Sequence, residues 1–460
     1  MRRFFLRPPH PSQHDFRYRS ALVCIGLTLS FMVSTAHSES LMDIYNLAAS
    51  NDPTIQRATA NHAAALEALP QSRANFLPSI DFQASREESD QDITKSSVIN
   101  PTTGLPRTGT SSFSNTDYSL RLKLPLYQRN NYVVRRLAKH SVTRADAEYE
   151  VARQNLLLHV AETYFDILAH RDDLEFARAE KLAIKRQLEQ TQQRFDVGLV
   201  AITDVHESQA RYDLTLAEEI LASNQLDNRI EALRTFTGTY HNELDKLDDD
   251  ITLVRPDPED IDQWTRTALE QNPALLAAQA TLNESRENVA QQRSGHYPTL
   301  DLNASYSYSD RGGVFSSTTD TNAIGLSFNL PIYAGGRTRS QTRQALHLLE
   351  ASRQTLEEQR RNTQRQVRNA YLGVLSGISR VKALKQALVS NQSALRAAEA
   401  GYDVGTRTTV DVLLARRNLF SAQRDYAQSR YDYILNTLRL KQASGSLTTD
   451  NLQAISSWLH

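Results

Sequence analysis

The sequence predicts a mixed α and β fold, mainly α-helical, in which long helices and short strands occur twice along the chain. Three observations lead to this prediction. Similar phrases recur in the same order in both halves, two long tracts contain no proline, and four short segments alternate apolar with polar residues. Recurring phrases indicate a duplicated unit, proline-free tracts favour long helices, and strict alternation is typical of a strand with one exposed face.

The amino terminus has the composition of an export signal. Five arginines precede the apolar stretch ALVCIGLTLSFMV, and the small residues of STAHSES follow it. This order is typical of a cleaved secretory signal, so we assign residues 1–38 to a signal peptide. A lipid-modified Cys24 would follow a small residue, whereas here it follows Val23, which favours ordinary secretion.

Composition excludes several classes of function. The net charge is −1, and the signal's five arginines and one aspartate amount to +4, so the exported chain carries −5. A negative charge argues against nucleic acid as a partner. Cys24 is the single cysteine, so the exported chain uses neither disulfides nor thiol chemistry. The twelve histidines show no metal-ligand spacing, and no nucleophile motif or phosphate-binding loop occurs. We therefore predict no enzyme, no metal site and no cofactor.

The duplication is visible in matched phrases. SNDPTI pairs with EQNPAL, from Pro53 to Pro273, at an offset of 220 residues. LKLPLYQ pairs with FNLPIYA, from Pro125 to Pro331, at an offset of 206 residues. The order is the same and only a loop length differs. We therefore place the first structural repeat at residues 39–248 and the second at residues 249–460.

Each repeat has a tract in which we expect long helices. No proline lies between Pro125 and Pro256 or after Pro331, and both tracts are rich in good helix formers. The apolar residues of the second tract at 4-3-4-3 spacing are Val367, Tyr371, Val374, Ile378 and Val381. The matching set in the first tract is Val160, Tyr164, Ile167, Arg171 and Leu174, with one charged interruption. This spacing is the seam of a coiled coil, and a helix over residues 131–195 would be roughly 100 Å long.

Four segments alternate instead, and we predict strands at about residues 79–90, 116–127, 299–309 and 322–333. In DYSLRLKLPLY, for example, Leu120 and Leu122 share one face while Arg121 and Lys123 share the other. Each run has about ten residues, the length of a tilted membrane strand. Four strands cannot close a membrane barrel, because an open edge in lipid leaves backbone groups unpaired. We expect three copies to build a twelve-stranded barrel, with the helices continuing as a hollow cylinder into the periplasm.

The phrases TQQRFDVGLVAITDV, GLSFNLPIYAGGR and GYDVGTRTTVDVL make the sequence similar to the TolC family of outer-membrane efflux channels. The resemblance runs from about Leu41 to Leu452. It implies a trimeric twelve-stranded outer-membrane β-barrel, with four strands per subunit, continuous with a long α-helical coiled-coil tunnel in the periplasm. A mixed belt around the tunnel would come from the segment around Asp245 to Trp264 and from the carboxyl-terminal stretch.

The resemblance also implies a function and partners. The protein would be the outer-membrane exit duct of a tripartite efflux or type I secretion system, passing drugs, small toxic compounds or proteins to the exterior. Its partners would be two further copies of itself, a periplasmic adaptor (membrane fusion) protein, an inner-membrane RND, ABC or MFS transporter, and outer-membrane lipid. The alternative is a structural periplasmic coiled-coil or adaptor protein without a pore. That alternative explains the helices and leaves the four alternating segments without a purpose.

The two DVG phrases would be turns at the periplasmic tips of two helical hairpins. Gly198 and Gly405 permit the positive φ with which a chain leaves a helix. Asp204 and Asp411 lie near the start of the returning helices, where negative charge is favourable. Capping alone is a complete structural account of both aspartates.

The family's closed state implies a second role for these turns, as a latch. Tyr402 would bond to Asp204 in its own subunit. Arg407 would reach Asp204 and the backbone near Thr203 of a neighbouring subunit. Exposed charge pairs contribute about 0–1 kcal/mol each, so a partner protein can displace them.

Two further features are carried over from the family. Gln187 and Glu399 match a second link that keeps the tunnel closed. The narrowest constriction of the family has the pattern D-V-L-D, and this sequence reads DVLLARR, with Asp411 at the first position and Leu414 at the second aspartate position. We therefore expect one ring of three carboxylates in the trimer. A single ring prefers cations, but it lacks the second ring of the family pattern, which implies block by divalent cations.

Overall fold

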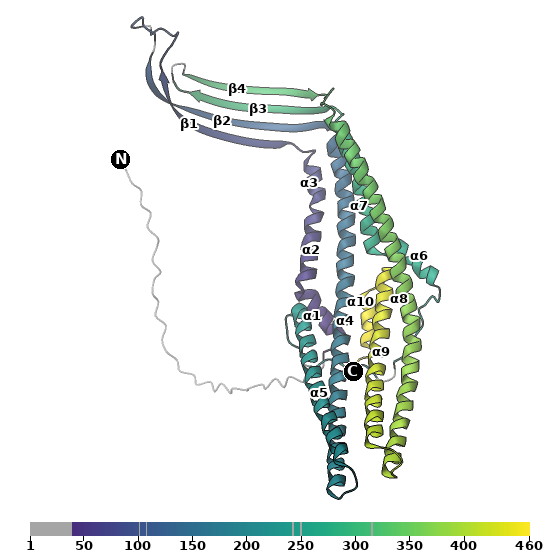
Figure 1. Ribbon diagram of the computed structural model, residues 1–460. Helices are drawn as coiled ribbons and strands as arrows, with labels where there is room; N and C mark the ends of the chain where they lie inside the picture. Colours follow the sequence, from purple (N-terminus) through teal and green to yellow (C-terminus); the bar gives the residue numbers. More distant parts are fainter. Residues whose placement is uncertain (1–38, 101, 107, 242, 249–250, 314–315) are drawn as a thin grey trace, which may run out of the picture. The chain divides into compact units, whose positions relative to one another are not determined.

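The computed structural model describes residues 39–460 except 101, 107, 242, 249–250 and 314–315. The predicted signal peptide at residues 1–38 lies outside the described residues. Helices dominate the described part of the chain and one antiparallel sheet accompanies them, so the predicted mainly α-helical mixed fold is confirmed (Figure 1).

The two halves share one order of elements, except that the first half has an extra short helix before its strands and the second half ends with a further short helix. In the first half they are α1 (Leu41–Asn51), α2 (Pro53–Leu66), α3 (Ala68–Ala74), β1 (Ser79–Ile93), β2 (Gly109–Gln128), α4 (Arg129–Asp196) and α5 (Ile202–Thr237). In the second half they are α6 (Ile261–Gln271), α7 (Pro273–Ser294), β3 (Thr299–Arg311), β4 (Ser317–Asn329), α8 (Arg337–Asp403), α9 (Thr409–Ser444) and α10 (Thr449–Ser456). Each half therefore has short helices, a pair of strands and then a long helical hairpin.

The matched phrases SNDPTI and EQNPAL form the same local structure. Asp52 caps α2 by accepting a hydrogen bond from the backbone of Thr54, and Pro53 is the first helical residue. Asn272 caps α7 in the same way through Leu275, and Pro273 follows it. Proline suits this position because the first amide of a helix has no intrahelical partner and the fixed φ is already helical. The repeated phrase is therefore a repeated helix start.

The two longest helices carry the predicted seams. α4 has 68 residues and α8 has 67, so each extends for roughly 100 Å at about 1.5 Å per residue. All five predicted seam residues of α8 are buried, and so are the four apolar seam residues of α4. The charged interruption, Arg171, donates a hydrogen bond to the carbonyl oxygen of Leu244 at 3.0 Å. No helix within the described residues has the length and apolarity needed to span a membrane.

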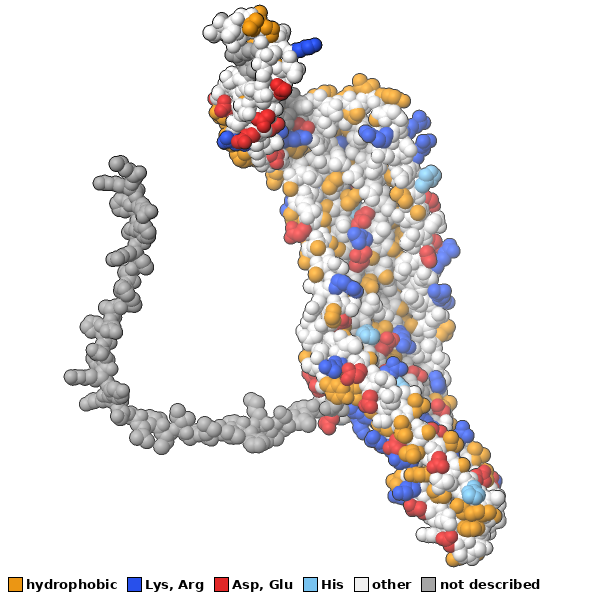
Figure 2. Space-filling view, turned by 60° about the vertical axis from the view of Figure 1, so that its left-hand side comes forward, with side chains coloured by type: hydrophobic (Ala, Val, Ile, Leu, Met, Phe, Trp, Pro, Cys, Tyr) orange, Lys and Arg blue, Asp and Glu red, His pale blue; other side chains and the backbone are white. Residues whose placement is uncertain are grey.

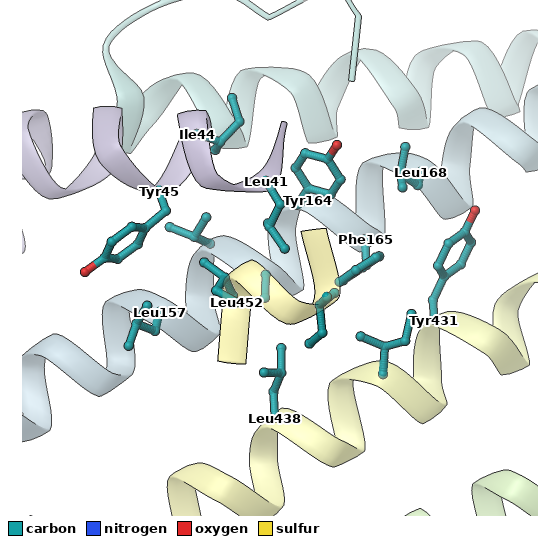
Figure 3. Packing of buried hydrophobic residues seen from close by; sticks show 14 of the residues in the cluster. Leu41, Ile44, Tyr45, Leu157, Tyr164, Phe165, Leu168, Tyr431, Leu438 and Leu452 are labelled. Atoms are coloured by element: carbon teal, nitrogen blue, oxygen red, sulfur yellow. The ribbon is translucent and has the colours of Figure 1, made fainter. Parts of the chain in front are cut away.

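The main hydrophobic core lies where α1, α4, α9 and α10 meet. Figure 3 shows Leu41 of α1, Phe165 of α4, Leu438 of α9 and Leu452 of α10 pointing toward one another. All four side chains are almost completely removed from solvent. Full burial of such a side chain contributes about 1.5–3 kcal/mol, so this cluster fixes the packing of α4 against α9.

A small belt of extended chain crosses this core. Glu39 forms a parallel bridge with Leu244, and Leu247 forms an antiparallel bridge with Leu459. The buried hydroxyl of Tyr164 lies 3.2 Å from the carbonyl oxygen of Glu39 and 3.1 Å from that of Asp245. The start of the segment from Asp245 to Trp264 and the carboxyl-terminal stretch therefore pair within the chain. Tyr164 and Arg171 attach this small belt to α4, and a belt around the whole tunnel stays a prediction.

The sheet has the order β1-β2-β3-β4, with every neighbouring pair antiparallel. Its register places Phe82 opposite Leu120, and Leu120 opposite Tyr306. Leu302 lies opposite Leu326 in the next pair. Because side chains alternate across a sheet, these residues share one apolar face. The other face is polar.

The predicted limits of three strands need correction. β2 begins at Gly109, seven residues before the predicted 116, and β1 continues to Ile93. The added residues are mostly polar, so they pair through their backbones without an alternating apolar pattern. β4 covers Ser317–Asn329 rather than 322–333. Pro331 has no amide hydrogen to donate, which ends the strand before the apolar pattern ends.

Candidate functional site at the helical hairpin tips

The two DVG phrases form the turns between α4 and α5 and between α8 and α9. Gly198 and Gly405 both have a φ of 77°, as predicted for residues at which the chain leaves a helix. An added Cβ would meet no atom within 4 Å at either glycine, so conformation rather than space requires the residue. Glycine adopts this left-handed region without the steric cost that other residues incur.

Both aspartates lie in the first turn of the returning helix. Asp204 accepts a hydrogen bond from the backbone of Ala201 at 3.2 Å. Asp411 accepts from the backbone and the hydroxyl of Thr408, both at 2.9 Å, and its own amide donates to that hydroxyl at 3.2 Å. These bonds, led by the one from the Thr408 backbone, lower the pKa of the Asp411 carboxyl. The capping role of Asp204 and Asp411 is therefore observed in a single chain.

Tyr402 lies at the junction of the two hairpins. Its ring centroid is 4.5 Å from the guanidinium carbon of Arg194, which is in the last turn of α4. The same guanidinium lies 3.4 Å from a carboxylate oxygen of Asp403. The Tyr402 hydroxyl accepts a weak hydrogen bond from Thr409 at 3.5 Å. Arg194 therefore joins the end of α4 to the end of α8, a contact that sequence reasoning missed.

Arg407 packs over a glycine that sequence reasoning also missed. A Cβ at Gly401 would lie 2.7 Å from Cγ of Arg407, so only glycine leaves room for this side chain. The amide of Arg407 donates to the carbonyl oxygen of Gly401 at 3.2 Å. The guanidinium is 3.9 Å from Asp411 and is 61% exposed. The first copy of the phrase reads RFDVG and the second reads GYDVG, so Gly401 stands where the first copy has Arg194. This difference was the sequence signal that could have indicated a special role for Gly401.

Within the described residues of one chain, no hydrogen bond joins Tyr402 or Arg407 to Asp204 or Thr203. Thr203 is exposed and Asp204 is partly exposed at the start of α5. The bond expected between Tyr402 and Asp204 lies within one subunit and is not formed here, where the Tyr402 hydroxyl contacts Thr409 instead. The contacts expected of Arg407 need a neighbouring chain, so the latch stays a prediction.

The second expected link, between Gln187 and Glu399, has a different local arrangement. Glu399 pairs with Arg416 of α9 at 2.6 Å, and Arg416 also donates to the carbonyl oxygen of Ala183 at 2.9 Å. Arg416 therefore connects α8, α9 and α4, a role that the sequence alone did not indicate. Gln187 is buried, and its Nε2 has no hydrogen-bond partner among the described residues.

The expected constriction residues lie on one helix. Asp411 and Leu414 are three positions apart in α9, a spacing that puts both on the same side of the helix. Leu414 is 53% exposed in the single chain. Across the residues that the structure describes, no group of histidine, cysteine, aspartate or glutamate side chains has an arrangement suited to holding a metal ion.

Comparison with known proteins identifies the family. Residues 44–239 and 264–446 match the family described as "Outer membrane efflux protein". The chain is 38% identical over 440 residues to "Outer membrane protein TolC" of Vibrio cholerae, covering 95% of this chain and 97% of the relative. It is 28% identical to "Alkaline protease secretion protein AprF" of Pseudomonas aeruginosa, covering 94% of this chain and 90% of that one.

The fold has solved counterparts. The crystal structure of the Campylobacter jejuni CmeC outer membrane channel matches with a TM-score of 0.76 at 19% identity, covering 98% of each chain. Nothing in these comparisons favours a coiled-coil or adaptor protein without a pore. The chain therefore belongs to the family of outer membrane efflux proteins, which are transport channels, and it resides in the outer membrane with its helices in the periplasm.

Proposed function

We propose that the protein is the outer-membrane exit duct of a tripartite efflux or type I secretion system. Drugs, small toxic compounds or proteins pass through it from an inner-membrane transporter to the exterior. One observation carries the proposal: a four-stranded sheet with an apolar face and two open edges is joined directly to two long helical hairpins. The activity that we propose is transport without catalysis.

The two faces of the sheet fit a channel wall in a membrane. Ile324 and Phe82 on the apolar face are 79% and 69% exposed in the single chain. Contact with lipid removes such surfaces from water, which is the arrangement of outer-membrane barrels. The opposite face carries Arg121, Lys123 and Asp301, and Lys123 lies 3.6 Å from Asp301. A polar face of this kind suits a water-filled interior.

The sheet edges support a homotrimer. β1 and β4 each pair with one neighbour among the described strands, so each leaves one edge open. In lipid the backbone groups of an open edge have no hydrogen-bond partner, so closure with other subunits is required. Three subunits supply twelve strands, a number within the range of membrane barrels, and two subunits supply only the minimum of eight.

We expect the full chain, extracted in mild detergent, to have the mass of three subunits, because an isolated sheet cannot satisfy its edges. Native mass spectrometry or light scattering that accounts for bound detergent measures this directly. A monodisperse monomer that retains its full strand content by circular dichroism would contradict the shared barrel.

The hairpin tips offer a surface for a periplasmic adaptor. Exposed apolar side chains gather there, and Figure 2 shows hydrophobic side chains at the end of the long helices. The exposed apolar residues of the two turns and helix starts are Val197, Leu199, Ile202, Val404 and Val410. An apolar patch with a polar surround is typical of a protein interaction site. We propose an adaptor there, which connects the duct to an RND, ABC or MFS transporter.

We also propose the latch at the tips. In this arrangement Tyr402 engages Asp204 of its own subunit, and Arg407 engages Asp204 and the backbone near Thr203 of a neighbouring subunit. Support comes from Arg407, whose guanidinium is largely exposed and 3.9 Å from its nearest carboxylate in the chain. The unused donor of buried Gln187 supports a second link with the Glu399 region of a neighbour.

The constriction can be tested by restoring the second acidic position. Leu414→Asp is expected to strengthen block of the open current by trivalent cations by about tenfold or more, because six carboxylates would then surround one axis instead of three. Concentration dependence of block in planar bilayers is the measurement. Asparagine has nearly the same size as aspartate without its charge, so Leu414→Asn should be blocked by trivalent cations as wild type is. If the aspartate and asparagine variants are blocked equally, Leu414 does not line the constriction.

A further inference from the structure

A cavity of about 300 Å³ lies beside the belt, away from both the tips and the sheet. It forms where α6, α8, α9 and α10 meet the linking segment 254–257. Its walls are mainly apolar and aromatic, and the residues that matter here are Trp264, Trp458, Tyr433, Val254, Leu438 and Ile455. Its volume is at the lower end of the range for small-molecule sites.

Most polar groups around the cavity already have partners. The hydroxyl of Tyr433 accepts from the amide of Val254 at 2.8 Å and donates to its carbonyl oxygen at 2.9 Å. The indole nitrogen of Trp264 donates to the carbonyl oxygen of Pro258 at 2.8 Å. These bonds fix one wall of the cavity in place. The Tyr433 hydroxyl and the Trp264 indole nitrogen are therefore already used and are not the groups that would bind a ligand.

Lys441 of α9 is the exception. It lines the cavity at partial burial, and among the described residues its ammonium group forms no hydrogen bond or ion pair. Burial lowers the pKa of this ammonium group, because the charged form loses hydration. An unpaired charge beside apolar walls is unfavourable unless an anion accompanies it.

The other charged residues at the cavity do not meet this need. Arg255 pairs with Glu259 at 2.9 Å and is exposed. Asp257 is also exposed, so water solvates its carboxylate, and no ion pair joins it to Lys441 within the described residues. The cavity therefore combines a mainly apolar interior with one cation whose hydrogen-bond donors have no partner among the described residues.

We propose that this cavity binds a small amphipathic anion, whose aromatic body contacts Trp264 and Trp458 and whose carboxylate or sulfonate pairs with Lys441. The site is separate from the hairpin tips and from the sheet. Its ligand would connect the belt segment 254–257 and α10 to the long helices α8 and α9. Aromatic contact and a charge-assisted hydrogen bond are the two contributions that would hold it.

The chain supplies its own reporter for this site. It contains two tryptophans, and both line the cavity, so tryptophan-selective fluorescence of the whole protein reports on the cavity. We expect 2-naphthoate, added to the intact oligomer in detergent, to change this emission in a saturable manner. The neutral 2-naphthamide has nearly the same shape and is expected to bind at least tenfold more weakly.

Variants test the role of the charge. Lys441→Gln is expected to weaken 2-naphthoate binding at least tenfold and to leave 2-naphthamide binding unchanged. Lys441→Arg keeps the positive charge and should retain 2-naphthoate binding. Lys382→Gln on α8 removes an exposed lysine outside the cavity and serves as the matched control. Equal binding of the acid and the amide by the wild-type protein would overturn the proposal without any variant. Absence of saturable binding would also overturn it, including the case in which a neighbouring subunit fills the cavity.

Discussion

Tyr402→Phe combined with Arg407→Ser is expected to raise the single-channel conductance severalfold in planar bilayers while the oligomer remains intact. Two contacts would be lost in each of three subunits, at about 0.5–1 kcal/mol apiece, or about 3–6 kcal/mol in total. A change of about 5.5 kcal/mol moves a two-state equilibrium from 1:99 to 99:1, so the open state would become the major one.

A capping variant is the control for the latch. Thr408→Ala removes the hydroxyl that caps α9 and leaves Tyr402 and Arg407 in place. It should lower helix stability by about 1 kcal/mol and leave conductance near the wild-type value. If Thr408→Ala opens the channel as much as the latch variant does, the tip is held closed by helix capping. If the latch variant conducts like wild type, these two residues do not hold the entrance closed.

Arg211→Met is expected to destabilise the hairpin of α4 and α5 by about 3–5 kcal/mol, because it would leave Glu180 buried without its main partner. Glu180 is 1% exposed, its Oε1 lies 2.5 Å from the guanidinium of Arg211, and its Oε2 is 3.7 Å from Arg424 of α9. Methionine preserves most of the packing of the arginine stem. The measurement is the urea midpoint of helix loss by circular dichroism at fixed protein concentration.

The matched control is a pair on the same two helices whose arginine is exposed. Arg178→Met removes an ion pair with Glu219 in which the arginine is 62% exposed, and Glu219 keeps Lys181 as its partner, so the expected loss is below about 1 kcal/mol. Equal shifts of the urea midpoint in the two variants would mean that the burial of Glu180 does not determine the loss of stability. A normal midpoint for Arg211→Met would mean that Arg424 compensates for the lost partner.

The helix seams and the turns could be predicted because each depends on residues that are close together in the sequence. The seam around Tyr164 and Tyr371 depends on spacing along one helix, and the turns at Gly198 and Gly405 depend on backbone conformation. Both are properties of a short stretch of chain, and the structure has both. The early start of β2 could not be seen, since backbone pairing between polar residues leaves no apolar pattern.

Most of the contacts that sequence reasoning missed are between distant segments. Arg171 was visible only as an interruption of the seam, and its role in holding the belt requires knowledge that Leu244 lies beside it. Arg194 and Arg416 look like ordinary solvated arginines on polar helices. Their partners at Tyr402 and Ala183 are more than 200 positions away, and no local pattern indicates them. Gly401 is informative only once the position of Arg407 is known.

The open edges of β1 and β4 also constrain the order in which a subunit matures. Helix packing in the hairpins depends mostly on contacts between neighbouring segments, which form early, whereas the final strand pairing involves a second molecule. Before that encounter each new chain presents two unpaired edges and an exposed apolar face, the combination most prone to misassembly. Completion of the barrel therefore depends on subunit concentration, and a chain with a defective edge would also disable the normal chains that it joins.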